Sequence, residues 1–382
     1  MIYNVGLLFV FKYLSFTLRG VDYVFHTGVA ADIALPVGIS FFTFQLMSYV
    51  FDVCRTPELA RRNPLDVALY VSLFPQLIAG PIVRFETVAG EIRGRVETSR
   101  DFTDGMTRFV FGLGKKLLIA NYAGFSADEI FASALPLSAA TAWIGAAAYT
   151  LQIYFDFSGY SDMAIGLGRM FGFHFEENFN YPYVSKSITE FWRRWHISLS
   201  AWFRDYLYIP LGGSRGAKGR TVFNLFVVWL LTGIWHGANW TFIAWGLYYF
   251  ALLLAERAAR ERGLSGRFPG WAGHLYALFF VMIGWVLFRS ESIAEAGRYL
   301  AFMFGANGWA DESARLYFRD GKTVLLAGTV FSMPVAAWCK KRFNVGAGLR
   351  DAAISLSLLL VFVLSLLACI KNSYNPFIYF NF

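Results

Sequence analysis

The chain has 382 residues, of which 16% are charged and 57% are hydrophobic, and its mean hydropathy is +0.46. Soluble domains carry about 25% charged residues, and a single soluble core stops growing near ~300 residues. The composition therefore excludes an ordinary soluble protein and predicts one integral membrane domain over residues 1–382. The net charge of +8 does not indicate nucleic-acid binding, because Lys and Arg occupy short loops between apolar runs, as in the cytoplasmic loops of membrane proteins.

The apolar runs predict an all-α membrane protein, since a spanning helix requires about 20 mostly apolar residues. Several runs contain polar side chains such as Gln45, Gln152 and Asp156, which are unfavourable against lipid and indicate a packed bundle around a wet interior. Lys12 interrupts the first run, which lacks the cleavage site of a signal peptide. The candidate spans are residues 2–18, 33–53, 66–83, 105–124, 138–157, 221–236, 240–256, 273–289, 323–339 and 353–370.

The segment 183–209 follows a different pattern. Its large apolar residues recur at steps of three and four and form one stripe on a single helix, while its charged residues lie off the stripe. We predict a helix that lies at the membrane interface or dips into the membrane, begins at Ser187 or Thr189 and ends at Pro210. The stripe consists of Phe191, Trp195, Leu199, Trp202 and Tyr206.

Loop charge predicts the orientation of the chain. The segment 290–322 is not basic and is expected outside the cytoplasm, together with the turn after His236 and the aromatic tail, 371–382. Three segments are net basic and are therefore expected on the cytoplasmic side: residues 204–220, 256–272 and 340–352.

Two histidines in tryptophan-rich surroundings are the candidate catalytic residues. His236 ends an apolar run and precedes Gly237, where the backbone can approach a ligand closely. A neutral imidazole in an apolar pocket can act as a general base toward a hydroxyl group; the alternative is a structural histidine bonded to a backbone carbonyl. His196, expected on one helix face with Arg193 and Ser200, would orient His236, bind an acyl donor or anchor its helix.

Neither a metal site nor a disulfide framework is predicted. Two histidines without nearby carboxylates make a poor metal site, and the cysteines, which we expect to be reduced and buried, lack metal-binding spacing. Asp156 and Asp162 are expected to line a cavity or to pair with an arginine, mainly as structural residues. The glycines of 166–172 have the wrong spacing for a dinucleotide loop and indicate helix packing. The cysteines are Cys54, Cys339 and Cys369.

The last nine residues, 374–382, include five aromatic side chains. Such a tail is typical of an aromatic belt at the membrane interface. The alternative is that the hydroxyl of Tyr379 accepts an acyl group. A phenol has a pKa near ~10, well below that of a sugar hydroxyl. The acyl-transfer free energy of its ester therefore lies between those of a thioester and an alkyl ester, and the phenol ester can pass the acyl group on to a sugar.

These motifs together resemble the bacterial membrane-bound O-acyltransferases, most closely the members that serve alginate O-acetylation. The resemblance extends from about residue 5 to the C-terminus and covers most of the chain. It is carried by residues 152–166, 187–200, 202–208, 211–213 and 235–238, and by the C-terminal aromatic motif.

The resemblance implies a ring of about nine to eleven transmembrane helices around a central funnel or tunnel, with interfacial helices. It implies that His236 is the catalytic histidine, His196 the second motif histidine and Tyr379 the residue that relays the acyl group. It also implies that acetyl-CoA or another acyl thioester is the donor substrate, with no bound cofactor. The expected partners are a periplasmic SGNH-type acetyltransferase and the exopolysaccharide synthesis and export machinery, at a bacterial inner membrane. Relatives usually begin with two or three further spans, so the N-terminal helices of the family are expected to be missing.

Two other functions compete with an acyltransferase. A transporter would show inverted repeats and paired broken helices, and neither is visible in the sequence. A scaffold for polysaccharide export without catalytic activity would tolerate replacement of both histidines. The motif residues and the resemblance both favour the enzyme.

Overall fold

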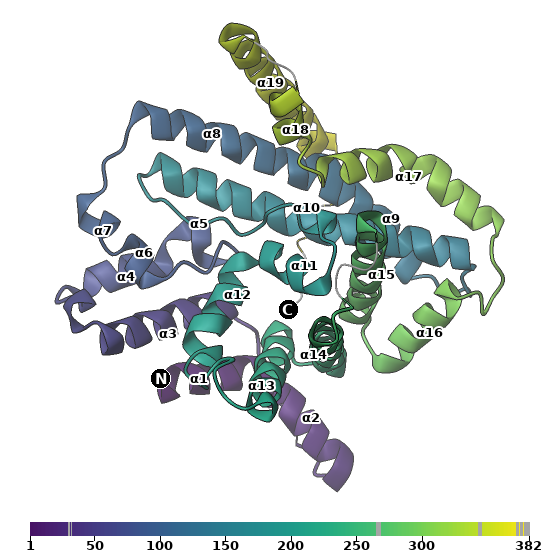
Figure 1. The fold of residues 1–382 in the computed structure, drawn as a ribbon, viewed down its shortest axis with the longest axis horizontal. Helices are drawn as coiled ribbons and strands as arrows, with labels where there is room; N and C mark the ends of the chain where they lie inside the picture. The colour runs from purple at the N-terminus through teal and green to yellow at the C-terminus, as the bar shows by residue number, and fades with distance from the viewer. Residues whose placement is uncertain are drawn as a thin grey trace.

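The regular structure of the chain is helical, as predicted (Figure 1). The computed structural model describes residues 1–29, 31, 33–264, 269–342, 346–371, 374 and 377. Within these residues the only β-type pairing is one isolated bridge between Ala306 and Gly308. The fold class is therefore an all-α membrane protein.

The α-helices of the described residues are α1 Ile2–Leu8, α2 Leu14–Phe25, α3 Ile39–Arg55, α4 Pro64–Ser72, α5 Phe74–Leu77, α6 Phe85–Val88, α7 Glu91–Gly94, α8 Ser99–Gly114, α9 Asn121–Phe131, α10 Ala139–Met170, α11 Ile188–Arg194, α12 Ile197–Phe203, α13 Lys218–His236, α14 Trp240–Glu261, α15 Gly270–Arg289, α16 Ile293–Met303, α17 Glu312–Phe331, α18 Val335–Arg342 and α19 Ala347–Lys371. Short 3₁₀ turns lie at η2 Pro57–Leu59 and η4 Pro182–Val184, and π-helical turns at η1 Phe9–Tyr13, η3 Lys115–Ala120 and η5 Arg204–Tyr208. The turn η1 joins α1 to α2, and η3 joins α8 to α9.

Two of the predicted spans are broken at a proline. The run 66–83 is divided between α4 and α5, with the break just before Pro75, and it continues as a loop. The run 323–339 crosses a break at Pro334, where α17 and α18 meet at 59°. In both places proline removes a backbone donor and clashes with the preceding turn, which ends a helix. An apolar run therefore did not predict a continuous helix there.

By length and composition, three helices among the described residues could each cross a membrane. They are α14, α15 and α19, and the bent pair of α17 and α18 would be a fourth if it forms one span. The other long helices are interrupted by polar residues or are shorter. The expected ring of nine to eleven spans stays a prediction.

Glycine pairs let the longest helices cross at backbone contact. A Cβ atom on Gly166 of α10 would lie 2.5 Å from the carbonyl oxygen of Gly105 in α8, and one on Gly159 would lie 2.8 Å from that of Gly112. Small residues at such crossings are typical of helix pairs in membranes. The interpretation of the 166–172 glycines as helix packing is confirmed for Gly166, whereas Gly168 packs on the ring of Phe175 and Gly172 has a left-handed backbone with φ of 76° just after α10.

Polar residues of the predicted spans lie inside the protein, as expected. Asp156 is 1% exposed, and its carboxylate lies 2.5 Å from Lys116 Nζ. Asp162 pairs with Arg108 at 2.8 Å and with Lys115 at 2.5 Å, so the expected pairing of Asp162 with an arginine is confirmed. The expectation of buried thiols was wrong for Cys54 and Cys369, which are exposed on the surface of the chain. The other buried polar side chains include Gln45, Ser48, Gln76 and Gln152.

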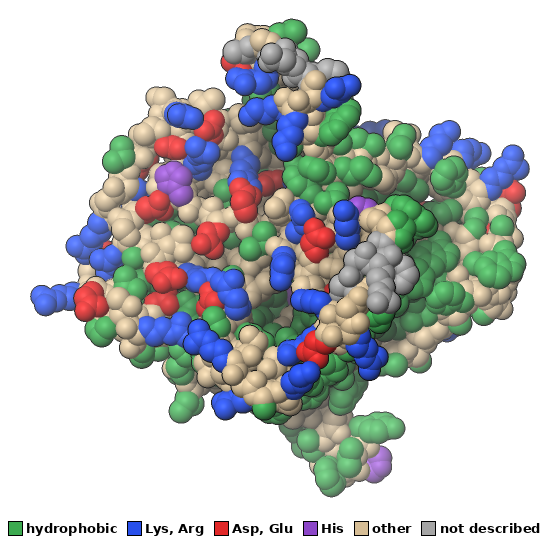
Figure 2. Space-filling model, viewed as in Figure 1, with side chains coloured by type: hydrophobic (Ala, Val, Ile, Leu, Met, Phe, Trp, Pro, Cys, Tyr) green, Lys and Arg blue, Asp and Glu red, His purple; other side chains and the backbone are tan. Residues whose placement is uncertain are grey.

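One face of the protein is strongly charged. Figure 2 shows acidic and basic side chains together over α3 to α12, whereas the flank formed by α14, α15 and α17 is mostly hydrophobic. This division fits a membrane protein that exposes one polar face to water and an apolar flank to lipid.

Candidate active site

The motif segment forms two short helices, so the prediction of one continuous helix over 183–209 was wrong. It begins as predicted at Ser187, whose hydroxyl accepts a hydrogen bond from Glu190 N at 3.0 Å. The helix then stops, because Trp195 is extended and His196 has a left-handed backbone with φ of 44°. A new helix, α12, starts after His196. His196 therefore does not share a helix face with Arg193 and Ser200.

Asn178 explains the break. Its carbonyl oxygen accepts from Ile197 N at 2.9 Å, and its side-chain oxygen accepts from Ser198 N at 3.3 Å and from Ser198 Oγ at 2.9 Å. These bonds replace helical bonds at the start of α12, where the first N–H groups have no partner within the helix. The N-cap residue of α12 is His196, and Asn178, from the preceding loop, supplies the capping hydrogen bonds and fixes the turn that carries His196.

The ring of His196 is completely enclosed. His196 is 1% exposed, its Nδ1 lies 3.1 Å from Asn178 Oδ1, and the ring packs edge-to-face on Phe157 at 4.6 Å. Because an amide oxygen only accepts, Nδ1 is the donor and Nε2 carries the lone pair. Nε2 has no hydrogen-bond partner among the described residues.

His236 is the last residue of α13 and is also buried, at 5% exposure. Its ring contacts Trp245 at 4.9 Å and Phe288 at 5.2 Å. Its Nδ1 has no hydrogen-bond partner in the part of the chain that the structure describes. The two histidines come together at Trp235, whose ring centroid lies 5.0 Å from that of His236 and 6.2 Å from that of His196.

Glycines place α13 and α14 in backbone contact beside His236. A Cβ on Gly233 would lie 2.5 Å from the carbonyl oxygen of Phe242, and one on Gly246 would lie 2.4 Å from that of Trp229. A Cβ on Gly237 would lie 2.2 Å from the ring of Phe242. We expected Gly237 to admit a ligand, but the close neighbour is this ring, so the glycine serves packing within the protein.

Side chains from the start of the chain cap the C-terminal end of α13. Tyr13 donates its hydroxyl hydrogen to Ile234 O at 2.9 Å. Lys12 Nζ donates to Trp235 O at 2.6 Å, to His236 O at 3.4 Å and to Ser40 Oγ at 2.9 Å. The last carbonyls of a helix have no partner within it, and they form the negative end of the helix dipole, where a cation is favourable.

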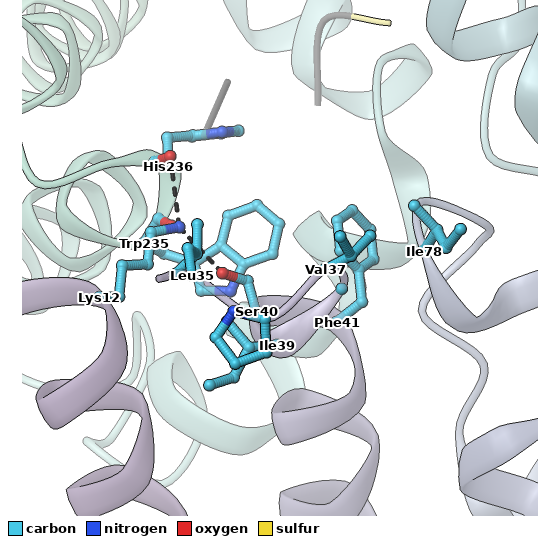
Figure 3. A pocket seen from close by; sticks show the side chains of 11 residues that line it. Lys12, Leu35, Val37, Ile39, Ser40, Phe41, Ile78, Trp235 and His236 are labelled. Atoms are coloured by element: carbon cyan, nitrogen blue, oxygen red, sulfur yellow. Dashed lines mark hydrogen bonds between the residues drawn. The ribbon is translucent and has the colours of Figure 1, made fainter. Parts of the chain in front are cut away.

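A small cavity of about 60 Å³ adjoins these groups. Figure 3 shows Lys12 between Ser40 and the carbonyl oxygens of Trp235 and His236, with Ile78 on the opposite side. The walls are mainly apolar, with the Lys12 ammonium and the Ser40 hydroxyl at one end beside the carbonyl oxygens of Trp235 and His236. Sites for small molecules combine apolar walls with a few convergent polar groups in the same way, but they measure about 300–1,000 Å³, so this cavity is smaller than a site for a whole donor molecule.

The charged face carries basic side chains around the motif helices. Arg204 and Arg84 both contact Asp205, the latter at 2.8 Å. The hydrogen bond from Arg204, followed by the charge of Arg84, lowers the pKa of the Asp205 carboxyl. This carboxylate is therefore ionised at neutral pH and offsets part of the positive charge of Arg204.

Tyr379 lies outside the described residues, and the tail is represented by Tyr374 and Phe377. The hydroxyl of Tyr374 donates to Asp128, and its carbonyl oxygen accepts from Asn121 Nδ2 at 3.4 Å. Phe377 packs on Tyr160 at 5.0 Å and joins the main hydrophobic core. The chain after α19 therefore contacts the protein interior at both described positions.

Sequence reasoning missed Lys12 and Asn178 as parts of this site. The signal for Lys12 was present, since a charged residue within an apolar run is a functional candidate. No local pattern marked Asn178, because its partners follow it by 18 to 20 residues.

Comparison with known proteins gives a consistent result. A sequence model described as the membrane-bound O-acyltransferase family matches residues 7–293. A probable alginate O-acetylase of Azotobacter vinelandii is 42% identical over 97% of this chain and 82% of its own length. A peptidoglycan O-acetyltransferase of Helicobacter pylori is 34% identical over 100% of this chain and 81% of its own length. A teichoic acid D-alanyltransferase of Bacillus subtilis is 32% identical over 57% of this chain and 58% of its own length.

Proposed function

The chain belongs to the membrane-bound O-acyltransferase family, and from this premise we propose that it moves an acetyl group from cytoplasmic acetyl-CoA across the bacterial inner membrane for O-acetylation of an exopolysaccharide such as alginate. It is a membrane O-acyltransferase, as its relatives are. The donor, the acceptor polymer, the multi-pass topology and the residue roles below are proposals.

The observation that carries the mechanism is the buried imidazole of His236, whose Nδ1 has no hydrogen-bond partner among the described residues; the residue also lines a small cavity. In the proposed reaction His236 takes the proton of the Tyr379 hydroxyl, and the phenolic oxygen attacks the thioester carbonyl. A C–O bond forms, the C–S bond breaks, and the proton passes to the departing thiolate. General base catalysis of this kind contributes about 10²- to 10⁴-fold to the rate.

The contacts of the described tail residues support a tyrosine relay. Phe377 packs on Tyr160, which follows Phe157 by three residues in α10, and Phe157 contacts His196. The tail therefore contacts Tyr160, which lies within one helical turn of Phe157. Phe157 in turn packs on the ring of His196. Tyr379 follows Phe377 by two residues in the sequence. A tail that served only as an interfacial belt would not need contacts of this kind.

We propose that the donor approaches from the charged face, where Arg204, Arg215 and Lys218 are exposed. A basic surface attracts an anionic donor such as a CoA thioester. Asp205 pairs with Arg204 and Glu261 with Lys218, so the attraction is weaker than three free cations would give. On the other side, the acetyl group would pass from tyrosine to a serine of a periplasmic SGNH-type acetyltransferase or directly to the polymer that the export machinery delivers.

The test replaces His236 by Ala in cells that make the polymer. We expect polymer acetylation to fall to background while the amount of protein in the membrane is unchanged. Acetylation that persists at the normal rate contradicts the proposed function. Tyr379→Phe keeps the ring and removes only the hydroxyl oxygen, so loss of acetylation in this variant separates a relay from an anchor. Mass spectrometry of the intact C-terminal peptide checks for an acetyl group on Tyr379.

A further inference from the structure

Lys12 is a buried cation whose position needs an explanation. Its side chain is 8% exposed, and among the described residues it forms no salt bridge with a carboxylate; its hydrogen bonds go to neutral oxygens. Burying an ammonium group is costly unless it is paired or fully hydrogen-bonded. The three acceptors use all three donors of the ammonium group, and two of them are the last carbonyls of α13.

The end of α13 depends on this contact. Many helices end in a left-handed residue, usually glycine, that turns the chain back and satisfies the last carbonyls. Gly237 instead has φ of −176° and leads straight away from the helix. The carbonyls of Ile234, Trp235 and His236 are therefore satisfied by Tyr13 and Lys12, which precede them by more than 220 residues.

The local backbone brings both capping residues to the same helix end. Lys12 and Tyr13 are the last two residues of the π-helical turn η1, and both reach the last turn of α13. Turns of this kind are frequent at functional sites, and Lys12 of this turn lines the same cavity as His236.

We infer that Lys12 is a positioning residue that holds the last turn of α13, and with it the imidazole of His236, where acyl transfer requires a base. The inference rests on the proposed function of His236. Lys12 acts through the backbone, since its donors are occupied by protein oxygens and none is left for a substrate. The carbonyl oxygens of Trp235 and His236 in turn stabilise the Lys12 ammonium group. The contact therefore joins the turn η1 to the end of α13.

The test compares Lys12→Met with Tyr13→Phe in the full chain, in membranes that contain the polymer machinery, with acetyl-CoA as the donor. Lys12→Met removes the cation that bonds to Trp235 O and His236 O, whereas Tyr13→Phe removes only the neutral cap on Ile234 O. A misplacement of about 1 Å can cost about 10²-fold in rate. We therefore expect kcat of Lys12→Met to fall about 10- to 100-fold with an unchanged KM for acetyl-CoA, and kcat of Tyr13→Phe to fall less than about three-fold.

Several outcomes overturn the inference. A normal kcat in Lys12→Met overturns it. So does a loss of activity that is fully explained by a smaller amount of folded protein. A raised KM with an unchanged kcat shows that Lys12 binds the donor instead. If Lys12→Met fails to fold, Lys12→Gln keeps an N–H donor without the charge, and a kcat equal to that of the unaltered enzyme overturns the role of the cation. If His236→Ala is inactive and Lys12→Met is fully active, only the positioning role of Lys12 is contradicted. If His236→Ala is active, the proposed function is contradicted, and the positioning role fails with it.

Discussion

His196 and His236 are both buried beside Trp235, but the protein holds them in different ways. His196 is held by its own ring, whose Nδ1 is bonded to Asn178. His236 is held by its backbone, through the bond from Lys12 to its carbonyl oxygen, while its Nδ1 has no partner among the described residues. The bond at Nδ1 fixes the tautomer and orientation of the His196 ring and leaves its Nε2 without a partner among the described residues. The His236 ring is held by its aromatic neighbours Trp245 and Phe288 and through its backbone.

The proposed function gives the two histidines separate roles within one aromatic cluster. A general base needs a nitrogen that is not already occupied, and both rings have one among the described residues, Nδ1 in His236 and Nε2 in His196; the role of base is proposed for His236. His196 suits a residue that shapes the cluster, because the bond to Asn178 ties it to α12 and to the loop before α11.

The largest effect is expected from glutamine at the two histidines. His236→Gln keeps the size and polarity of the side chain but provides no basic nitrogen, so we expect the rate of polymer O-acetylation to fall about 10²- to 10⁴-fold. In His196→Gln the amide can donate to Asn178 again, so the expected loss is about ten-fold or less. Initial rates in membranes with matched protein content measure both. Equal losses in the two variants would remove the distinction between base and shaping residue.

A smaller effect is expected from Asn178→Ala. This change removes the bonds to His196 and Ser198 and the bond that Asn178 Nδ2 donates to Ser161 Oγ at 3.0 Å. Each buried group left without a partner costs about 1–3 kcal/mol, so the protein should unfold at a lower temperature and the rate should fall about ten-fold or more. Thermal unfolding in detergent and the acetylation rate measure the two effects.

Asn180→Ala is the matched control, because Asn180 is exposed in the same loop. It should change neither the unfolding temperature nor the rate. If Asn178→Ala behaves like this control, Asn178 does not fix the turn at His196.

The local parts of this site were predictable from sequence, and the parts that join distant segments were not. The stripe from Phe191 to Tyr206 is buried, and Ser187 caps α11, because periodicity and capping depend only on neighbouring residues. The break at His196 was missed, since it depends on bonds from Asn178. The stripe also continues across the break without a change in spacing, so it contained no sign of the interruption.

Lys12 shows the same limit at a greater distance. The sequence marks it as a charge in an apolar run, but no pattern connects it with the end of α13. The two glycine contacts beside His236 were equally hidden, because Gly233 and Gly246 do not differ in sequence from glycines that face open space. The fold class and both histidines followed from composition and resemblance, whereas the contacts that position the imidazoles required the structure.

Gly233→Ala is expected to move His236 without touching it. The new Cβ would lie 2.5 Å from Phe242 O, so α13 and α14 must separate, at a cost of about 1–3 kcal/mol for overpacking. Because His236 follows Gly233 by three residues, the imidazole should shift relative to Trp245 and the rate should fall about ten-fold or less. Acetylation rates and thermal unfolding check this. Gly219→Ala in the same helix meets open space and should leave both unchanged; a normal rate in Gly233→Ala would mean that the position of His236 does not depend on this crossing.

The smallest effect is expected at the tail, where Asp128 bonds to Tyr374 and lies 2.5 Å from Arg289. These side chains are about a third exposed, at 35% for Asp128 and 31% for Arg289, so the charged contact contributes only about 1 kcal/mol. Asp128→Asn should therefore slow acetylation by about five-fold or less, by loosening the tail and leaving both histidines in place. Tyr374→Phe removes the other partner, and because the two changes break one interaction, the double variant should be no slower than the slower single variant. Losses that multiply would show that Asp128 and Tyr374 act separately, and the bond between them would then not be what holds the tail against α9.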